Sequence, residues 1–260
     1  MAQYDEIAEK YLAYKLHSSF CENVEYHTFV HRLLLPALGI KDATTIDVKN
    51  VLASYRVLDL ACGGGYLTRK LREELGCEDV VGVDISANMI AIARATEAAH
   101  PLGIVYHVLD VLNLVKPEKK FDIVVAFYLL NYAKTIDELD RMVYIIGEQL
   151  NDRDKAHFLS ITLNVRDSEN IINSDRYQNY RCEAETPLVD GAQIKNMQIN
   201  SDGSSFAYTT YYFSRTIYEQ AFQKAGFKHF EWVPVTVAGD IDKYEDFLKF
   251  PDVIGILAHK

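Results

Sequence analysis

The 260-residue sequence lacks the features of secreted and membrane proteins. It has only four cysteines, and they form no C-x-x-C pair: Cys21, Cys62, Cys77 and Cys182. The acidic stretch Met1 to Glu9 does not resemble the basic and then apolar start of a secretory signal. No apolar run approaches the roughly 18 residues that span a bilayer. These absences predict a soluble protein in a reduced, cytoplasmic setting, without a membrane partner.

Positive charge is also scarce. The 27 basic residues are outnumbered by 37 acidic ones, which gives a formal net charge of -10. The densest basic run, Lys116 to Lys120, is interrupted by Pro117 and Glu118. Because nucleic acid phosphates and anionic membranes would be repelled, we expect a small neutral or cationic substrate and no nucleic acid partner. The oligomeric state is not indicated.

The motifs of several chemistries are missing. His27 and His31 are four residues apart on a predicted helix, but no third ligand and no H-E-x-x-H motif accompany them, so we predict no metal site. The segment Ala126-Phe127-Tyr128-Leu129 lacks the Asn/Asp-Pro-Pro-Tyr of enzymes that methylate adenine or glutamine amino groups. No Pro-Cys is present to attack C5 of cytosine.

What the sequence does contain is a regular alternation of apolar runs and helical segments. The predicted strands are Val57–Leu60, Val80–Val83, Ile104–Leu109, Phe121–Phe127 and Ala156–Leu163. The helices predicted between them are Leu67–Leu75, Ala87–Ala99 and Ile136–Leu150. Near-continuous β-branched and apolar strands are typical of a parallel sheet covered on both faces. The sequence therefore predicts an α/β, doubly wound fold.

Two segments fall outside this alternation and are predicted to cap the ligand cleft. The first contains Tyr4, Tyr11 and Tyr14 at helical spacing, followed by a helix over Val24–Leu35 that Pro36 helps to end. The second contains the turn Asp202-Gly203 between alternating runs, which predicts a β-hairpin with strands Ala192–Ile199 and Ser205–Phe213. After it, we expect a helix over Arg215–Ala225 that Gly226 ends.

We accordingly expect one domain over residues 1–260. Residues 1–50 form an N-terminal helical cap, 51–164 the cofactor-binding core, 165–213 the inserted cap with its hairpin, and 214–260 the C-terminal part of the core sheet.

A glycine-rich turn follows the first strand, in the segment Arg56-Val57-Leu58-Asp59-Leu60-Ala61-Cys62-Gly63-Gly64-Gly65-Tyr66. Glycine allows a tight strand-to-helix turn and close approach of the backbone to a ligand. We therefore expect a nucleoside-bearing cofactor at this turn. Dinucleotide enzymes hold pyrophosphate in the same way, so the turn alone does not identify the cofactor.

Acidic residues end three successive strands. Asp84 follows Asp59 by 25 residues, and Asp110 follows at a similar interval, so all three are expected at one edge of the sheet. The Asp84 carboxylate can accept hydrogen bonds from both ribose hydroxyls. Asp110 can accept from an adenine amino group while the Val111 N–H donates to the ring. Alternatively, Asp84 or Asp110 only caps the helical turn after it, although Ser86 already suits that role after Asp84.

Four motifs together resemble those of class I S-adenosylmethionine-dependent methyltransferases: Asp59-x-Ala61-x-Gly63-x-Gly65, Val83-Asp84-Ile85-Ser86, Leu109-Asp110-Val111 and Phe121-Asp122-Ile123-Val124. The resemblance runs from about Tyr55 to Leu163. It implies an enzyme that uses S-adenosyl-L-methionine and releases S-adenosyl-L-homocysteine. It also implies a Rossmann-like methyltransferase fold with a seven-stranded, mostly parallel sheet, in which Phe227–Val237 and Val253–His259 are the last strands and the final one is inserted antiparallel. Ala61 stands where the family often has glycine.

The cofactor residues are predicted from these motifs and from the resemblance. A tyrosine at the position of Tyr11 is expected to lie over the cofactor, unless it only packs in the core. Met89 is expected against the adenine or ribose, or in the helix core. The predicted cofactor-binding residues are Tyr11, Asp59, Ala61, Cys62, Gly63, Gly65, Asp84, Ile85, Met89, Asp110, Val111, Phe127 and Tyr128.

Three further segments are similar to those of microbial natural-product methyltransferases, such as the N-methyltransferase of toxoflavin biosynthesis: Tyr4-Asp5-Glu6-Ile7-Ala8 with Tyr11, Tyr128–Ala133 and Tyr211–Arg215. This similarity suggests natural-product biosynthesis and an aromatic or heterocyclic acceptor methylated on nitrogen rather than oxygen. The catalytic residues stay unassigned. The acceptor-side candidates are Tyr128, Asn131, Tyr132, Asn164, Tyr211 and His31, the last as a base for O-methylation or simply as a solvated histidine.

Two other classes of function remain as alternatives. A nicotinamide-dependent oxidoreductase would have a third small residue in its glycine motif, where this sequence has Thr68. A non-catalytic S-adenosylmethionine-binding module would keep the cofactor site but leave no room for an acceptor beside it.

Overall fold

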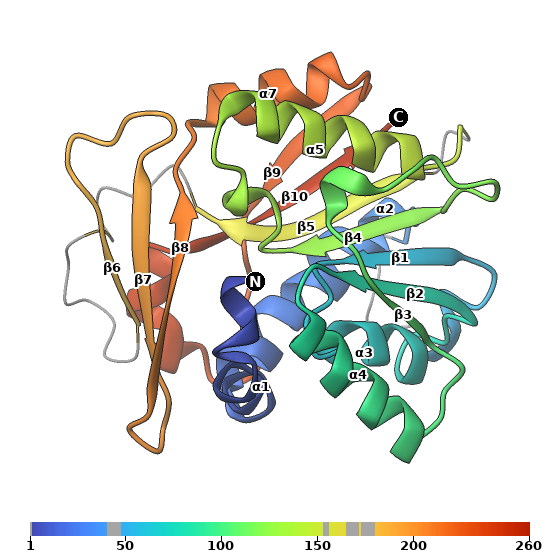
Figure 1. The fold of residues 1–260 in the computed structure, drawn as a ribbon, viewed down its shortest axis with the longest axis horizontal. Coiled ribbons are helices and arrows are strands. Elements are labelled where there is room, and N and C mark those ends of the chain that lie inside the picture. The colour runs from blue at the N-terminus through green and yellow to red at the C-terminus, as the bar shows by residue number, and fades with distance from the viewer. Residues whose placement is uncertain (1, 41–47, 153–155, 165–171, 173–179) are drawn as a thin grey trace.

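A seven-stranded sheet forms the centre of the computed structural model, which describes residues 2–40, 48–152, 156–164, 172 and 180–260. The strand order is β3-β2-β1-β4-β5-β10-β9 (Figure 1). The strands span Arg56–Leu60 (β1), Asp79–Asp84 (β2), Val105–Val108 (β3), Ile123–Phe127 (β4), His157–Leu163 (β5), His229–Val233 (β9) and Val253–His259 (β10). β10 runs antiparallel between β5 and β9, and the other pairs are parallel. The predicted fold is confirmed.

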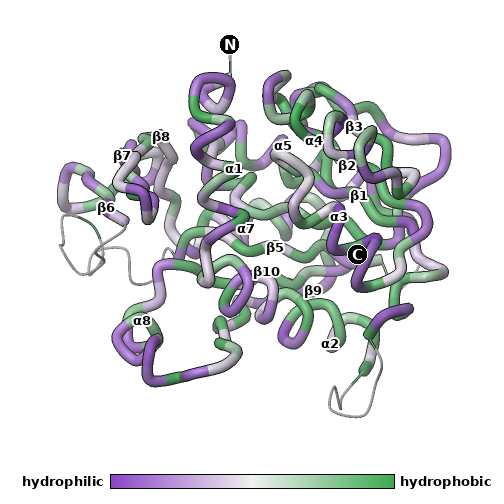
Figure 2. The backbone as a smooth tube through the Cα atoms, turned by 90° about the horizontal axis from the view of Figure 1, so that it is seen from below, coloured by the Kyte–Doolittle hydropathy of each residue, from purple (hydrophilic) through white to green (hydrophobic). Residues whose placement is uncertain are grey.

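Alternate residues of the inner strands enter two separate hydrophobic cores. Val57 of β1 packs with the N-terminal helical segments and with α3 and α4, whereas the next residue, Leu58, packs with α5 and α7. The α-helices span Ala8–His17 (α1), Leu35–Ala37 (α2), Tyr66–Glu73 (α3), Ala87–Ala99 (α4), Ile136–Gln149 (α5), Arg215–Lys224 (α7) and Glu245–Lys249 (α8). Both faces of the sheet are therefore covered, which explains why its strands are apolar on both sides. Figure 2 shows the central strands in the hydrophobic colour.

The second N-terminal helix differs from its prediction. Wide, π-helical turns occupy Cys21–Tyr26 (η2) and Phe29–Leu34 (η3), and the helix continues through α2 to Ala37. Pro36 does not end the helix. It lies in the first turn of α2, which begins at Leu35, and the first turn of a helix does not need a backbone N–H at that position. Gly39, with φ +74°, follows the helix.

A second, three-stranded antiparallel sheet lies beside the core. It is formed by Tyr180–Glu183 (β6), Gln193–Ile199 (β7) and Ser205–Tyr211 (β8). The predicted hairpin is β7–β8, but β8 ends at Tyr211 because Phe213 turns into the core and is fully buried. β6 was not predicted. Residues 165–171 and 173–179 of the predicted inserted cap (165–213), and residues 1 and 41–47 of the N-terminal cap (1–50), lie outside the described residues. The division into caps stays a prediction.

The N-terminal segment joins the core to the hairpin. Its first turn, Gln3–Asp5 (η1), uses the Gln3 amide to pair with both backbone groups of Thr209 on β8, each at 3.0 Å. The Asp5 carboxylate accepts a 2.6 Å hydrogen bond from the Ser86 hydroxyl, next to α4. Figure 1 shows α1 between the strands β7 and β8 and the helices α3 and α4. In the described part of the chain, no helix has the length and hydrophobicity to cross a membrane.

Candidate functional site

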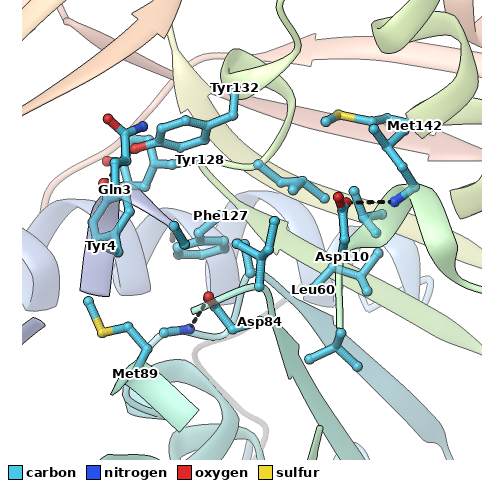
Figure 3. Close-up of a pocket in the computed structure, with 18 of the residues that line it drawn as sticks. Gln3, Tyr4, Leu60, Asp84, Met89, Asp110, Phe127, Tyr128, Tyr132 and Met142 are labelled. Atoms are coloured by element: carbon cyan, nitrogen blue, oxygen red, sulfur yellow. Dashed lines mark hydrogen bonds between the residues drawn. The ribbon is translucent and has the colours of Figure 1, made fainter. Parts of the chain in front are cut away.

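A cavity of about 480 Å³ opens at the carboxyl ends of β1, β2 and β4 (Figure 3). β1 lies between β2 and β4 in the sheet, so the chain order reverses here, and such switch points are where doubly wound folds bind ligands. Among the predicted cofactor residues, the structure brings these to the cavity wall: Tyr11, Ala61, Gly63, Asp84, Ile85, Met89, Asp110, Val111, Phe127 and Tyr128. Asp59, Cys62 and Gly65 do not line it.

The turn after β1 has an unusual backbone. Ala61, Gly63 and Gly65 have φ values of +56°, +55° and +85°. Side chains disfavour this left-handed region, which glycine enters without cost. The glycine that the methyltransferase family often has at the position of Ala61 would therefore suit this conformation better.

Gly65 has a packing role that the motif did not predict. A Cβ atom added there would lie 2.6 Å from the Tyr106 hydroxyl oxygen, and one added at Gly82 would lie 2.6 Å from the Tyr106 ring. The two glycines therefore make room for the Tyr106 side chain between the turn and β2. The sequence predicts a cofactor contact at Gly65, but the structure places Gly65 at the start of α3, where it does not line the cavity.

Asp59 lies beneath the turn rather than in the cavity. Its carboxylate is buried and accepts a 2.6 Å hydrogen bond from the Thr68 hydroxyl of α3. Burial raises the pKa of Asp59 to about 7, and the nearby Asp84 carboxylate adds to this effect. Thr68 occupies the place of the third small residue of a dinucleotide motif, and here it ties α3 to β1. Cys62 is buried beside Asp59, and burial raises its pKa.

Asp84 has both carboxylate oxygens at the cavity edge. Oδ2 accepts from the Gly63 N–H and Oδ1 from the Ser86 N–H, each at 2.8 Å. Burial raises the pKa of Asp84, and these backbone donors partly offset that effect. The Ser86 hydroxyl accepts from the Met89 N–H and caps α4, so Asp84 is not the helix cap.

Asp110 lies near Met142, across the cavity from Tyr4 and Tyr132 (Figure 3). Its carboxylate accepts from the Leu112 N–H at 2.9 Å and caps the short turn Val111–Asn113 (η5). Asp110 therefore caps the turn that follows it, as one of the two predictions held, and it also lines the cavity. Its predicted contact with adenine stays a prediction.

Four tyrosines form a wall shared with a second cavity: Tyr4, Tyr11, Tyr128 and Tyr132. The Tyr4 and Tyr132 hydroxyls form a 2.5 Å hydrogen bond, and the Tyr4 ring meets the Tyr11 ring edge-on at 5.1 Å. Tyr128, at the end of β4, has φ +57°. Left-handed backbone at a bulky residue is rare and concentrates at functional sites.

The second cavity measures about 740 Å³ and lies between α1, η2, α8 and the hairpin strands. Of the acceptor-side candidates, Tyr128, Asn131 and Tyr132 line this cavity, and Tyr211 lines the first one. Asn164 and His31 line neither. Asn164 donates to the Pro251 carbonyl at 2.7 Å, and His31 is exposed with its ring 4.5 Å from that of His27. No group of side chains in the described ranges could hold a metal ion.

Three charged residues of this region were not found from the sequence. Lys15 of α1 donates to Glu25 of η2 at 2.6 Å, and the other Glu25 oxygen accepts from the Tyr128 hydroxyl at 2.5 Å. The Lys15 ammonium also lies over the Tyr128 ring, 5.2 Å from its centroid. Asp252 precedes β10 and lines the same cavity. No sequence motif marks these residues, because only the folding of distant segments brings them together.

The part of the chain that resembles known proteins is the core of the sheet. Residues 57–151 match the family model of a methyltransferase domain. The chain is 37% identical over 129 residues to the demethylmenaquinone methyltransferase of Thermus thermophilus, covering 48% of this chain and 59% of that protein. It is 29% identical over 121 residues to a ubiquinone biosynthesis O-methyltransferase of Coxiella burnetii, covering 46% and 50%. The chain thus spans only about half the length of the curated relatives it matches.

The solved structures agree in fold. An S-adenosylmethionine-dependent methyltransferase from Clostridium acetobutylicum superposes with a TM-score of 0.57 at 20% identity, covering 90% of this chain and 98% of that one. The Rossmann-like methyltransferase fold expected from the sequence is thereby confirmed. The narrower resemblance to natural-product N-methyltransferases stays a prediction.

Proposed function

We propose that this protein is an enzyme that transfers the methyl group of S-adenosyl-L-methionine to a small aromatic or heterocyclic acceptor, on nitrogen in preference to oxygen. One observation carries the proposal: a cavity lined by the predicted cofactor residues shares a wall of four tyrosines with a larger, aromatic cavity. Because the two cavities adjoin at these tyrosines, a methyl donor in the first and an acceptor in the second would lie next to each other, as a direct transfer requires.

The first cavity fits the cofactor in size and polarity. Its volume of about 480 Å³ lies within the range of roughly 300 to 1,000 Å³ that ligand sites occupy. Asp84 would hold the ribose hydroxyls, Asp110 the adenine amino group, and Met89 and Val111 the faces of the adenine. When bound, the cofactor would supply an electrophilic methyl group on a sulfonium, with S-adenosyl-L-homocysteine as the group that leaves when an acceptor attacks the methyl carbon.

The protein's contribution to such a reaction is chiefly positioning. Aligning two bound reactants can supply roughly 7 to 11 kcal/mol of the barrier. Tyr11 and Tyr128 would place aromatic faces near the cationic donor, where their ring electrons attract positive charge. The hydrogen bond from Tyr128 to Glu25 fixes the orientation of this ring, and the Tyr4–Tyr132 bond holds the N-terminal segment against the core beside it.

The nature of the acceptor atom follows from the groups around the second cavity. Aromatic walls with the Asn131 amide favour a nitrogen that attacks with its own lone pair and needs no base. Oxygen is the second candidate, because a phenol would need a proton acceptor and the carboxylates of Glu25 and Asp252 line this cavity. The Coxiella burnetii relative is named as an O-methyltransferase.

The two alternative functions are less well supported. A non-catalytic binding module would need no acceptor space, whereas the second cavity offers about 740 Å³. A nicotinamide enzyme would need a small residue where Thr68 bonds to Asp59.

Calorimetric titration with S-adenosylhomocysteine and with NADH tests the cofactor assignment. We expect S-adenosylhomocysteine to bind and NADH not to bind, and preferential NADH binding would contradict the proposal. Methyl transfer is then tested with acceptors that carry either an aromatic amine or a phenol, with release of S-adenosylhomocysteine as the readout.

A further inference from the structure

The second cavity is lined by one carboxyl group that no described residue pairs with. Lys15 and Glu25 form an ion pair at 2.6 Å, with side chains only 10% and 4% exposed. Asp252 forms no ion pair with any residue that the structure describes, and its Oδ1 atom is buried without a hydrogen-bond partner there. Within the described part of the chain, Asp252 therefore offers the cavity an acceptor oxygen that the protein does not use.

The backbone holds Asp252 firmly in this position. The backbone N–H of Asn164 donates to the Asp252 carbonyl at 2.8 Å, and the Asn164 side chain donates to the neighbouring Pro251 carbonyl at 2.7 Å. Asp252 thus sits between the end of β5 and the start of β10, as a fixed part of the cavity wall.

A carboxylate oxygen that is buried without a hydrogen-bond partner is costly, and such a group in a cavity is a candidate for binding a ligand. Burial raises the pKa of Asp252 to about 7, and the Glu25 carboxylate contributes to that rise. A ligand that donates an N–H hydrogen bond or brings a positive charge to Asp252 would offset the cost of burying this oxygen. The aromatic rings that line the same space, among them Tyr180 and Tyr208, suit a flat molecule with positive charge.

We propose that Asp252 binds a protonated amine of the acceptor that is distinct from the atom methylated, so that the substrate class of this enzyme is an aromatic or heterocyclic molecule carrying a basic amine, held by a charge-assisted hydrogen bond in the second cavity. This inference rests on the proposed function, since it takes the second cavity as the acceptor site. The excess of acidic residues over the whole chain would also attract a cationic acceptor.

The test compares amines with neutral molecules of the same shape. Ligand-observed NMR measures the binding of benzylamine against benzyl alcohol, and of tryptamine against its isosteric alkylindole, to protein saturated with S-adenosylhomocysteine. We expect each amine to bind at least about tenfold more tightly than its neutral partner, as for a buried charge-assisted bond. In Asp252→Asn, each amine and its neutral partner should bind with about the same affinity.

The matched control is Asp242→Asn, which removes an exposed acid of the same C-terminal segment and should leave the preference unchanged. Absence of an amine preference in the wild-type protein, including failure of both amines to bind, would overturn the proposal. So would a preference that survives in Asp252→Asn. S-adenosylhomocysteine binding is measured separately on all three proteins, so that a failed cofactor assignment is distinguished from a failed acceptor assignment.

Discussion

The hydroxyl groups of Tyr4 and Tyr132 lie 2.5 Å apart, although 128 residues separate them in the sequence. Tyr4 belongs to the N-terminal turn that reaches the hairpin, and Tyr132 follows β4. Their bond therefore joins the N-terminal segment to the core at the place where the two cavities adjoin.

Removing the hydroxyl of Tyr4 or of Tyr132 should weaken the attachment of the N-terminal segment to the core. We expect Tyr4→Phe and Tyr132→Phe each to lower the free energy of unfolding by about 0.5 to 1.5 kcal/mol, the usual net value of one hydrogen bond. The double variant should lose little more than either single one, because both remove the same bond. Urea denaturation measures this, with the exposed Tyr144→Phe as the control. Additive losses would show that the two hydroxyls act independently.

Asp84 should determine cofactor affinity. In Asp84→Asn, one acceptor oxygen for the ribose hydroxyls is replaced by a donor, so we expect S-adenosylhomocysteine to bind about 10- to 100-fold more weakly. Calorimetric titration provides the measurement. Asp137→Asn, an exposed acid in the first turn of α5, should bind as the wild type does. Unchanged affinity in Asp84→Asn would place the ribose elsewhere.

Gly65 offers a test of the packing around Tyr106. Gly65→Ala combines a left-handed backbone with a contact of 2.6 Å to the Tyr106 hydroxyl, so we expect a loss of about 2 to 4 kcal/mol in unfolding free energy. Gly103→Ala is the matched control, because Gly103 has φ +81° but open space around it, and it should lose only about 1 kcal/mol.

Tyr106→Phe should recover part of the Gly65→Ala loss, since it removes the nearest clashing atom. Alone, Tyr106→Phe should be nearly neutral, because the Tyr106 hydroxyl is buried with no hydrogen-bond partner among the described residues. Equal losses in Gly65→Ala and Gly103→Ala would refute the steric explanation.

The buried Asp59 should make stability depend on pH. Its pKa is about 7 in the folded protein against 3.8 for an ordinary aspartate, so the folded state binds more protons between these values. Stability from this group is therefore present at low pH and is lost as pH rises from about 4 to about 7. Asp59→Asn should show a smaller fall in unfolding free energy between pH 5 and pH 8 than the wild type. An identical fall in both proteins would contradict the prediction.

The sequence predicted most of the core because its signals are local. Continuous apolar strands such as Val57–Leu60 and acids such as Asp84 and Asp110 at strand ends follow directly from a covered parallel sheet. β6 was missed because four residues, Tyr180–Glu183, carry too little alternation to mark a strand. The π-helical turns were missed because their spacing differs little from that of an ordinary helix.

The acceptor side could not be predicted in the same way. Glu25 and Tyr128 are bonded across 103 residues, and Asp252 meets them from the far end of the chain. Asn164 and His31 were plausible from residue type alone, yet neither lines the first or the second cavity. Long-range packing, not local pattern, decides which side chains surround an acceptor.

A crystal structure with bound S-adenosylhomocysteine tests the cofactor and acceptor assignments most directly. We expect the ribose hydroxyls on the Asp84 carboxylate, the adenine beside Asp110, and the sulfur facing Tyr128 and the second cavity. A cofactor whose sulfur points away from the shared tyrosines, or one bound outside the cavity at the ends of β1, β2 and β4, would contradict these assignments.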